Sequence, residues 1–369
     1  MSNNVNEIAN KKTRKPLAKK EFSLKDFKKK IGGEDIPQKP LEWISLGEAW
    51  KEETGLPGIP LGYATLARGF SNTGKSTLVS LGIVEAQKRG ILPIIIDTEN
   101  NLGRKRLESM GFDWENDFFM YVDNEYLLEN YGKKQDKNRS EAAIEDMAAC
   151  INDLLDMQDN GELPFDLFFG IDSFGTLDCI KSINAADKGS SDNNMWNAGA
   201  FDKSFKYLLN SRIPSSRKNN KEYTNTLVAV NKIYTVPGAM GGTLIVKNKG
   251  GEAAFYGCRL VYHFGGTMSH GTKKIKATSK GKEVTFGIET KIAVVKNQID
   301  GELGGIALEG KIVSVPTGVI SADKSSIDKY KKDNILFFRN ILGEEINPDD
   351  IGTKIEDVKG DNEVEFDLD

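Results

Sequence analysis

The chain has 369 residues, which is long enough for one large α/β domain with appendages or for two domains. Its 38% hydrophobic content and mean hydropathy of −0.43 are typical of a soluble protein. No apolar run reaches the ~18 residues of a membrane-spanning helix, so we expect no membrane association.

The net charge of −4 conceals two oppositely charged ends. Residues 1–30 carry ten Lys and Arg against three acidic residues, and residues 344–369 carry eleven Asp and Glu against two Lys. Such charge blocks are usually solvated and disordered. The alternative interpretation is functional: the basic end attracts a polyanion, and the acidic end competes with nucleic acid for basic surfaces.

Cys150, Cys179 and Cys258 share no close spacing, so neither a disulfide framework nor a zinc site is expected. The N-terminus is basic and polar without an apolar segment, which argues against secretion. We therefore expect a reducing, cytoplasmic location.

In chain order, the first two thirds alternate strand-like and helix-like segments. The expected strands and helices are a turn and strand at Pro60–Arg68, a helix at Thr77–Arg89, a strand at Ile91–Asp97, helices at Leu102–Met110 and Tyr126–Asp159, and strands at Phe165–Asp172 and Thr226–Val230. This alternation predicts a mostly parallel sheet flanked by helices.

The last third predicts an antiparallel extension of the sheet and then a helix. Its expected elements are strands at Arg259–Phe264, Lys273–Ser279, Glu283–Phe286 and Thr290–Val295, and one amphipathic helix at 324–341. The predicted organisation is a basic arm (1–40), an α/β core (41–320), a helical segment (321–343) and an acidic disordered tail (344–369).

The stretch 69–77 matches G-x-x-x-x-G-K-[ST], the loop that cradles nucleoside triphosphates. It lies between the first expected strand and helix, as phosphate binding requires. Its glycines allow backbone N–H groups to converge on phosphate oxygens. Lys75 would reach the β- and γ-phosphates, and the Ser76 hydroxyl would bind Mg²⁺. The predicted nucleotide contacts are Gly69, Ser71, Asn72, Thr73, Gly74, Lys75, Ser76 and Thr77.

Polar side chains end the next strands, at the edge where open α/β sheets bind ligands. Asp97 and Glu99 follow one strand, and Glu99 is placed to deprotonate the water that attacks the γ-phosphate. The alternative is helix capping by Asp97 with Glu99 as a first-turn charge. Asp172 ends the second strand and would hold the Mg²⁺ shell. Lys232 follows the third strand and would contact the γ-phosphate.

Two long segments on this side are predicted to be DNA-binding loops. Asn184–Ala200 contains Trp196 and leads to Lys203, and Thr235–Tyr256 contains Lys247 and Lys249. Lysines and an exposed aromatic ring suit backbone and stacking contacts with single-stranded nucleic acid. Each segment taken alone is equally compatible with an ordinary surface loop.

Together these residues resemble the RecA-type recombinases, most closely the divergent forms found in tailed phages, over about residues 40–300. The family order is kept in the phosphate loop, in Asp97-x-Glu99, in Ser109-Met110-Gly111-Phe112-Asp113, in Asp172-Ser173 and in Val294-Val295-Lys296-Asn297. The resemblance implies that Glu99 is the catalytic carboxylate and that Lys296 acts on the γ-phosphate of a neighbouring protomer.

Three positions depart from the bacterial pattern. Lys232 replaces a glutamine that couples nucleotide to DNA, and Gln298 replaces a second interface lysine. Arg106 aligns with a tyrosine that stacks on adenine, and an arginine plane is also able to stack.

The resulting hypothesis is a DNA-dependent ATPase, using ATP and Mg²⁺, that forms filaments on single-stranded DNA and pairs it with duplex DNA. Its partners would be further copies of itself, in a helical filament or a ring, and single-strand-binding and loader proteins. The alternatives are a hexameric helicase or translocase and a non-catalytic recombination mediator. A phage-encoded protein would act in the cytoplasm of its bacterial host.

Overall fold

The computed structural model describes residues 23–31, 37–189, 194–237, 244–249, 251–266, 271–299, 309–343 and 345–358. The chain divides into two compact units, Met1–Gln38 and Lys39–Asp369. In the first unit, the lysine-rich helix α1 (Leu24–Ile31) exposes Leu24 and Phe27. Most of the predicted basic arm lies outside the described residues, as do residues 359–369 of the predicted tail. All further description concerns the second unit.

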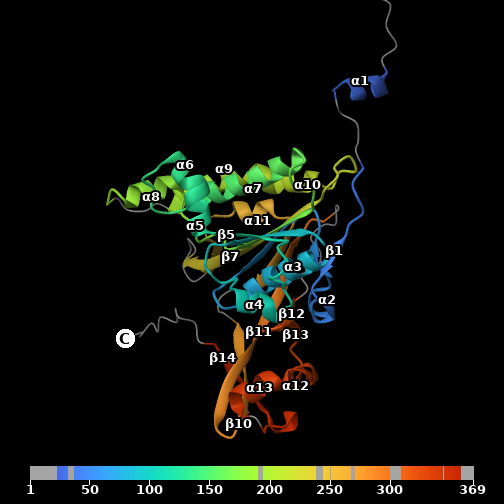
Figure 1. Ribbon diagram of the computed structural model, residues 1–369, viewed down its shortest axis with the longest axis vertical. Helices are drawn as coiled ribbons and strands as arrows, with labels where there is room; N and C mark the ends of the chain where they lie inside the picture. Colours follow the sequence, from blue (N-terminus) through green and yellow to red (C-terminus); the bar gives the residue numbers. More distant parts are fainter. Residues whose placement is uncertain are drawn as a thin grey trace, which may run out of the picture. The chain divides into compact units, whose positions relative to one another are not determined.

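The described part of this unit is built on a 12-stranded sheet whose centre is parallel. The parallel strands, in spatial order, are β9 (Leu260–Phe264), β3 (Ala64–Gly69), β7 (Asn225–Pro237), β6 (Leu167–Asp172), β4 (Leu92–Asp97) and β5 (Met120–Asp123). Helices cover both faces of this part (Figure 1), so the α/β class with a mostly parallel sheet is confirmed.

The helices of the core separate onto the two faces of the sheet (Figure 1). One face carries α5 (Asn124–Leu127), π-helix η1 (Leu128–Gly132), α6 (Lys133–Gln135), α7 (Ile144–Asp159), α8 (Ile180–Ala186), α9 (Asn194–Tyr207), π-helix η2 (Leu208–Arg212), α10 (Ile213–Ser215) and α11 (Ala253–Gly257). The other face carries α3 (Lys75–Lys88) and α4 (Arg104–Ser109). Helix α2 (Glu48–Thr54) packs near strands of the extension. No helix among the described residues has the length and apolar character needed to cross a bilayer.

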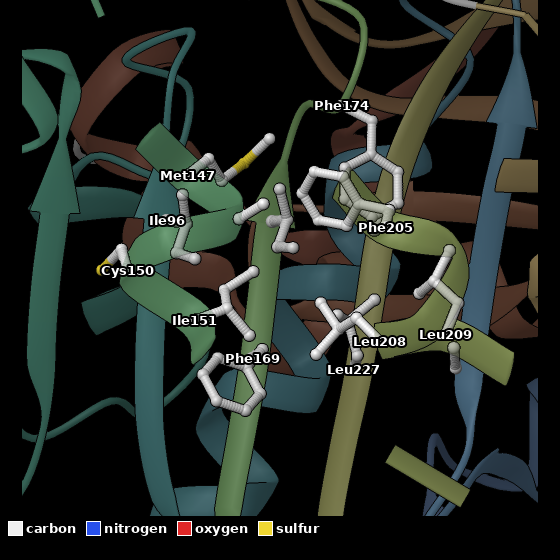
Figure 2. Packing of buried hydrophobic residues seen from close by; sticks show 14 of the residues in the cluster. Ile96, Met147, Cys150, Ile151, Phe169, Phe174, Phe205, Leu208, Leu209 and Leu227 are labelled. Atoms are coloured by element: carbon white, nitrogen blue, oxygen red, sulfur yellow. The ribbon is translucent and has the colours of Figure 1, made fainter. Parts of the chain in front are cut away.

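Successive side chains of the central strands lie alternately in two separate hydrophobic clusters. Ile94 and Ile96 belong to the cluster under α7 and α9, and Ile95 belongs to the cluster under α3. Figure 2 shows part of the first cluster, with Ile151 of α7 near Phe169 of β6. Burial on both faces explains why these strands are continuous apolar runs in the sequence.

Antiparallel strands extend the sheet beyond β9. They are β11 (Lys282–Asn297), β12 (Glu309–Val315), β13 (Gly318–Ser321), β10 (Thr272–Ser279) and β14 (Gly352–Asp357), while β8 (Leu244–Asn248) pairs with β7 and β1 (Trp43–Ser45) pairs with β2 (Gly58–Pro60). Two predictions about these strands were wrong, one on strand direction and one on where a strand ends. The strand expected at Arg259–Phe264 runs parallel to β3, and the strands expected at Glu283–Phe286 and Thr290–Val295 are one strand, β11.

The C-terminal segments also differ from the prediction. The helix expected at 324–341 is two helices, α12 (Lys324–Asp333) and α13 (Ile335–Leu342), which meet at Asn334. The segment expected to be disordered from residue 344 instead contains a 3₁₀ helix, η3 (Pro348–Asp350), and β14 within 345–358. These residues are ordered because Ile346 and Ile351 are buried in a third cluster with α12 and α13. The proposed domain boundaries themselves stay a prediction.

Candidate active site

The phosphate loop joins the carboxyl end of β3 to α3, and close contacts require its glycines. A Cβ on Gly69 would lie 2.3 Å from the Phe264 carbonyl oxygen. Gly74 has φ +88°, and a Cβ there would lie 2.6 Å from Ser314 Oγ. Asn72 also has a positive φ, 58°. The loop therefore turns tightly into the first turn of α3, whose N-cap residue, Gly74, provides no side-chain cap.

Lys75 is buried in this loop, where its ammonium donates to the Phe70 carbonyl and lies 3.4 Å from Thr73 Oγ1. Burial lowers the pKa of Lys75 to about 8, although the nearby Asp172 carboxylate opposes this shift. A buried ammonium without a carboxylate in ion-pair contact among the described residues is suited to bind phosphate oxygens.

Asp172 ends β6, beside Asp97 at the end of β4. It is 1% exposed, and its Oδ2 atom has no hydrogen-bond partner among the described residues. Burial raises the pKa of Asp172 to about 6, and the neighbouring Glu99 and Asp97 charges add to the rise, while a hydrogen bond from Ser76 opposes it. An unpaired buried carboxylate oxygen next to a serine hydroxyl fits Mg²⁺, which takes few protein ligands and completes its shell with phosphates and water.

Glu99 follows β4, and hydrogen bonds engage both of its oxygens. Oε1 accepts from the Ser173 hydroxyl and from Thr176 Oγ1 at 2.6 Å, while Oε2 accepts from Asn101 Nδ2 at 3.0 Å and lies 2.8 Å from Lys232 Nζ. Burial alone would raise the pKa of Glu99, but the bonds from Lys232, Ser173 and Thr176 outweigh it and lower the pKa to about 2. Glu99 is thus ionised at neutral pH.

Asp97 has a different role from Glu99. Its carboxylate accepts from the backbone N–H groups of Asn101 and Leu102, at 3.0 and 2.9 Å, and from the Tyr121 hydroxyl at 3.0 Å. Asp97 therefore stabilises the turn between β4 and α4. It is not the N-cap of α4, which is Gly103, and Glu99 precedes that helix, so the alternative interpretation as a helix cap with a first-turn charge was wrong.

Most of the predicted nucleotide residues surround one cavity of about 740 Å³ at the carboxyl end of the sheet. The lining contains residues 71–77 of the loop, Glu99, Asn101, Asp172, Val230 and Lys232, with Lys105, Arg106 and Ser109 of α4, Met110 after it, residues 285–288 of β11, and Ser314, Val315 and Pro316. Parallel pairing explains this convergence: β3 lies beside β7 with Gly69 opposite Lys232. The sequence analysis did not single out Thr176 or the residues of β11 and β12 that line the cavity, because distant segments supply them. It also missed Asn101, which lies only two residues after Glu99.

Lys296 lies on β11 and is not part of this cavity. Its ammonium donates to the carbonyl oxygens of Phe255 and Tyr256, at 2.9 and 2.8 Å. A residue acting on the nucleotide of a neighbouring copy would also lie outside the cavity of its own chain. The role of Lys296 stays a prediction.

The predicted DNA-binding residues lie on regular elements more than on loops. Trp196 belongs to α9 and packs against the first hydrophobic cluster, with Lys181 Nζ 4.0 Å from its ring centroid. Lys203 is exposed on the same helix. The expected loop at 235–256 is largely a hairpin of β7 and β8, with Lys247 on β8 and Lys249 just after it, both exposed. Residues 190–193, 238–243 and 250 lie outside the described residues.

Comparison with known proteins gives distant relatives of one kind. No protein-family model matches the chain. The chain is 36% identical to "Protein RecA" of Aquifex aeolicus (strain VF5) over 103 residues, which is 26% of this chain and 30% of that protein. It is 33% identical to "Protein RecA" of Aquifex pyrophilus over 122 residues, 31% of this chain and 33% of that protein.

A longer match, to "Protein RecA" of Wigglesworthia glossinidia brevipalpis, is 24% identical over 312 residues and covers 80% of this chain and 79% of that protein. The two Aquifex matches span only about a third of those relatives. The narrower resemblance to phage proteins stays a prediction. The three matches and the α/β architecture support a distant relationship of this chain to the RecA family.

Proposed function

We propose that the protein is an ATP-dependent DNA recombinase that assembles on single-stranded DNA and promotes homologous pairing and strand exchange with duplex DNA. One observation carries the proposal. Lys75, Asp172, Glu99 and Lys232 line one cavity, and Lys232 lies on the strand that continues into the lysine-bearing β7–β8 hairpin. The distant RecA relatives support the same function.

Each residue of the cavity would have a separate role in ATP hydrolysis. Lys75 would neutralise the β- and γ-phosphates, and Ser76 and Asp172 would hold Mg²⁺. When bound, Mg²⁺ supplies charge neutralisation to the phosphate oxygens. Glu99 would orient the water whose oxygen bonds to the γ-phosphorus, and would receive the proton of that water. The bond from the γ-phosphorus to the bridging oxygen breaks, and ADP retains the electron pair.

Lys232 would link hydrolysis to DNA. In the free chain it is paired with Glu99, and a γ-phosphate would compete for its ammonium. Release from Lys232 would restore part of the basicity of Glu99. The Lys249 N–H donates to the Lys232 carbonyl at 2.8 Å, so a shift of Lys232 would be transmitted directly to the hairpin.

Assembly would place the nucleotide between adjacent copies, with Lys296 of one copy stabilising the charge that develops on the phosphate held by the next. Each bound ATP would then bridge two subunits, which explains cooperative growth of a filament. Two other functions use the same core: a ring-forming helicase and a mediator that binds nucleotide without turnover. Glu99 argues against the mediator, since a pure binding switch needs no base.

The test is ATP hydrolysis by the purified chain with and without single-stranded DNA, together with electron microscopy in a slowly hydrolysed ATP analogue. We expect DNA-stimulated turnover and helical filaments. Absence of both contradicts the proposal. Closed rings that unwind a forked substrate favour the helicase, and filaments without turnover favour the mediator.

A further inference from the structure

Arg106 occupies the part of the cavity that borders the phosphate loop. Its Nη2 atom donates to Thr77 Oγ1 at 2.9 Å, and Thr77 lies in the first turn of α3. That turn also contains Lys75 and Ser76, and phosphate oxygens would meet the N-terminus of the helix there. A side chain that stacks on the base would instead have to reach the nucleoside, farther from this turn.

The Arg106 side chain is partly buried and its guanidinium has few partners. Its Nε atom is buried without a hydrogen-bond partner, and no carboxylate of the described residues forms an ion pair with it. Burial lowers the pKa of Arg106, while the charge of Asp172 raises it, so the side chain lies in the field of the proposed metal ligand. A buried cation without a counter-ion is costly unless a ligand supplies the negative charge.

A second part of the cavity lining offers neutral groups. It consists of residues 285–288 of β11 and the turn after β12, which Ser109 ties to α4 by a hydrogen bond of 2.7 Å to the Pro316 carbonyl. No acidic or basic side chain belongs to this part of the lining. It is suited to pack against a base or ribose without discriminating strongly among bases.

We infer that Arg106 binds the α- and β-phosphates of the nucleotide, held in place by Thr77, and does not serve as the stacking partner of the base. The inference rests on the proposed nucleotide site and deepens it. It corrects the expectation that Arg106 substitutes for a stacking aromatic residue. The inference also predicts a weak preference among nucleotide bases, because the polar contacts of Arg106 go to the phosphates.

The experiment measures equilibrium binding of Mg²⁺-ATP and Mg²⁺-UTP by calorimetry, in wild type and in Arg106→Met. We expect both nucleotides to lose affinity by the same factor, about 10- to 100-fold, which is the range of a charge-assisted hydrogen bond. We also expect affinity for ATP to depend less steeply on salt in the variant. Unchanged affinity, or a larger loss for ATP than for UTP, overturns the inference. If wild type binds no UTP, the salt dependence for ATP decides the question: an unchanged slope overturns the inference.

Two replacements at position 106 and one control complete the design. Arg106→Lys keeps the charge and should retain most of the affinity, whereas Arg106→Tyr keeps a stacking surface and should bind as weakly as Arg106→Met. The reverse order overturns the inference, even if Arg106→Met fails to fold. Arg104→Met is the matched control, since Arg104 is exposed on the same helix and paired with Glu108 and Glu115. If wild type binds no nucleotide at all, the proposed function fails before this inference is reached.

Discussion

The ammonium of Lys232 lies 2.8 Å from Oε2 of Glu99, so the residue proposed to sense the γ-phosphate is ion-paired with the residue proposed to activate water. The two come from β7 and from the turn after β4, which β6 separates in the sheet. The pair is partly shielded, with the Glu99 side chain 11% exposed and the Lys232 side chain 36% exposed. A negatively charged γ-phosphate would compete with Glu99 for the same ammonium, which makes the pair a natural point of control.

Replacing Lys232 by Met should uncouple hydrolysis from DNA. We expect the ratio of DNA-stimulated to basal turnover to fall at least about fivefold, the lower end of typical coupling energies. Loss of the ion pair should also raise the pKa of Glu99 from about 2, since the hydrogen bond and charge of Lys232 no longer lower it, and move the acid limb of the rate profile to higher pH. Lys232→Arg, which keeps the charge, is the control. An unchanged ratio in Lys232→Met would remove Lys232 from the coupling.

Replacing Glu99 by Gln should separate binding from chemistry. The amide keeps the shape of the carboxylate but is unable to accept the proton of water, so single-turnover hydrolysis should fall about 10²- to 10⁴-fold. ATP and DNA affinities should remain within about threefold of wild type, because Glu99 is not proposed to hold either ligand. Wild-type turnover in this variant would show that Glu99 is not the base.

Replacing Asp172 by Asn should stabilise the free protein while abolishing its response to Mg²⁺. The folded-state pKa of Asp172 is raised from its usual 3.8 to about 6, so the buried charge costs stability as pH rises from about 4 through 6. At pH 7–8 without ligands, we expect Asp172→Asn to unfold with a free energy higher by roughly 1–3 kcal/mol. Below pH 4 the difference should vanish. Urea unfolding measures this, and a variant less stable than wild type at pH 8 refutes the assignment.

Nucleotide affinity should follow a bell-shaped pH profile. Mg²⁺ requires the ionised form of Asp172, so affinity should rise as pH increases through about 6. Phosphate requires the ammonium form of Lys75, so affinity should fall as pH increases through about 8. Binding at pH 8 should accompany proton uptake, which calorimetry in buffers of different ionisation enthalpy detects. Affinity that is flat from pH 6 to 9 contradicts this account of Lys75.

Lys247 and Lys249 should contribute to DNA binding through phosphate contacts. Each change to Ala should weaken binding of single-stranded DNA at 100 mM salt and reduce the slope of log affinity against log salt by about 0.7. The matched control is Lys51→Ala, because Lys51 is an exposed lysine of α2, far along the chain from the hairpin. Equal effects of Lys51→Ala and Lys247→Ala would mean that the hairpin has no special role.

The sequence predicted the parts of the fold that depend on neighbouring residues. The phosphate loop, its flanking strand and helix, and the polar ends of β4 and β6 lie where short-range patterns placed them. Lys232, expected just after the third strand, instead lies within β7, which continues to Pro237. Parallel connection rules then predicted that Glu99, Asp172 and Lys232 would meet at one edge of the sheet. These predictions succeed because apolar runs and turn residues act locally.

The errors share a different cause. Three features depend on which strands pair: the parallel direction of β9, the continuity of β11 as one strand, and the formation of β14 in a segment expected to be disordered. The pairing partners lie far away in the sequence. The surroundings of Trp196 likewise depend on distant segments, since its ring is partly buried against the first hydrophobic cluster and beside Lys181. Its role in DNA binding stays a prediction. No local pattern shows how much of an aromatic side chain the rest of the fold will cover.

The amino-acid sequence alone thus determined which residues are chemically equipped for phosphate and metal, since a loop motif and polar strand ends are local properties. Only the tertiary structure decided how those residues are paired. The ion pair of Lys232 with Glu99, the hydrogen bond from Tyr121 to Asp97 and the position of Arg106 beside Thr77 all arise because sheet order and helix packing bring remote side chains within hydrogen-bonding distance.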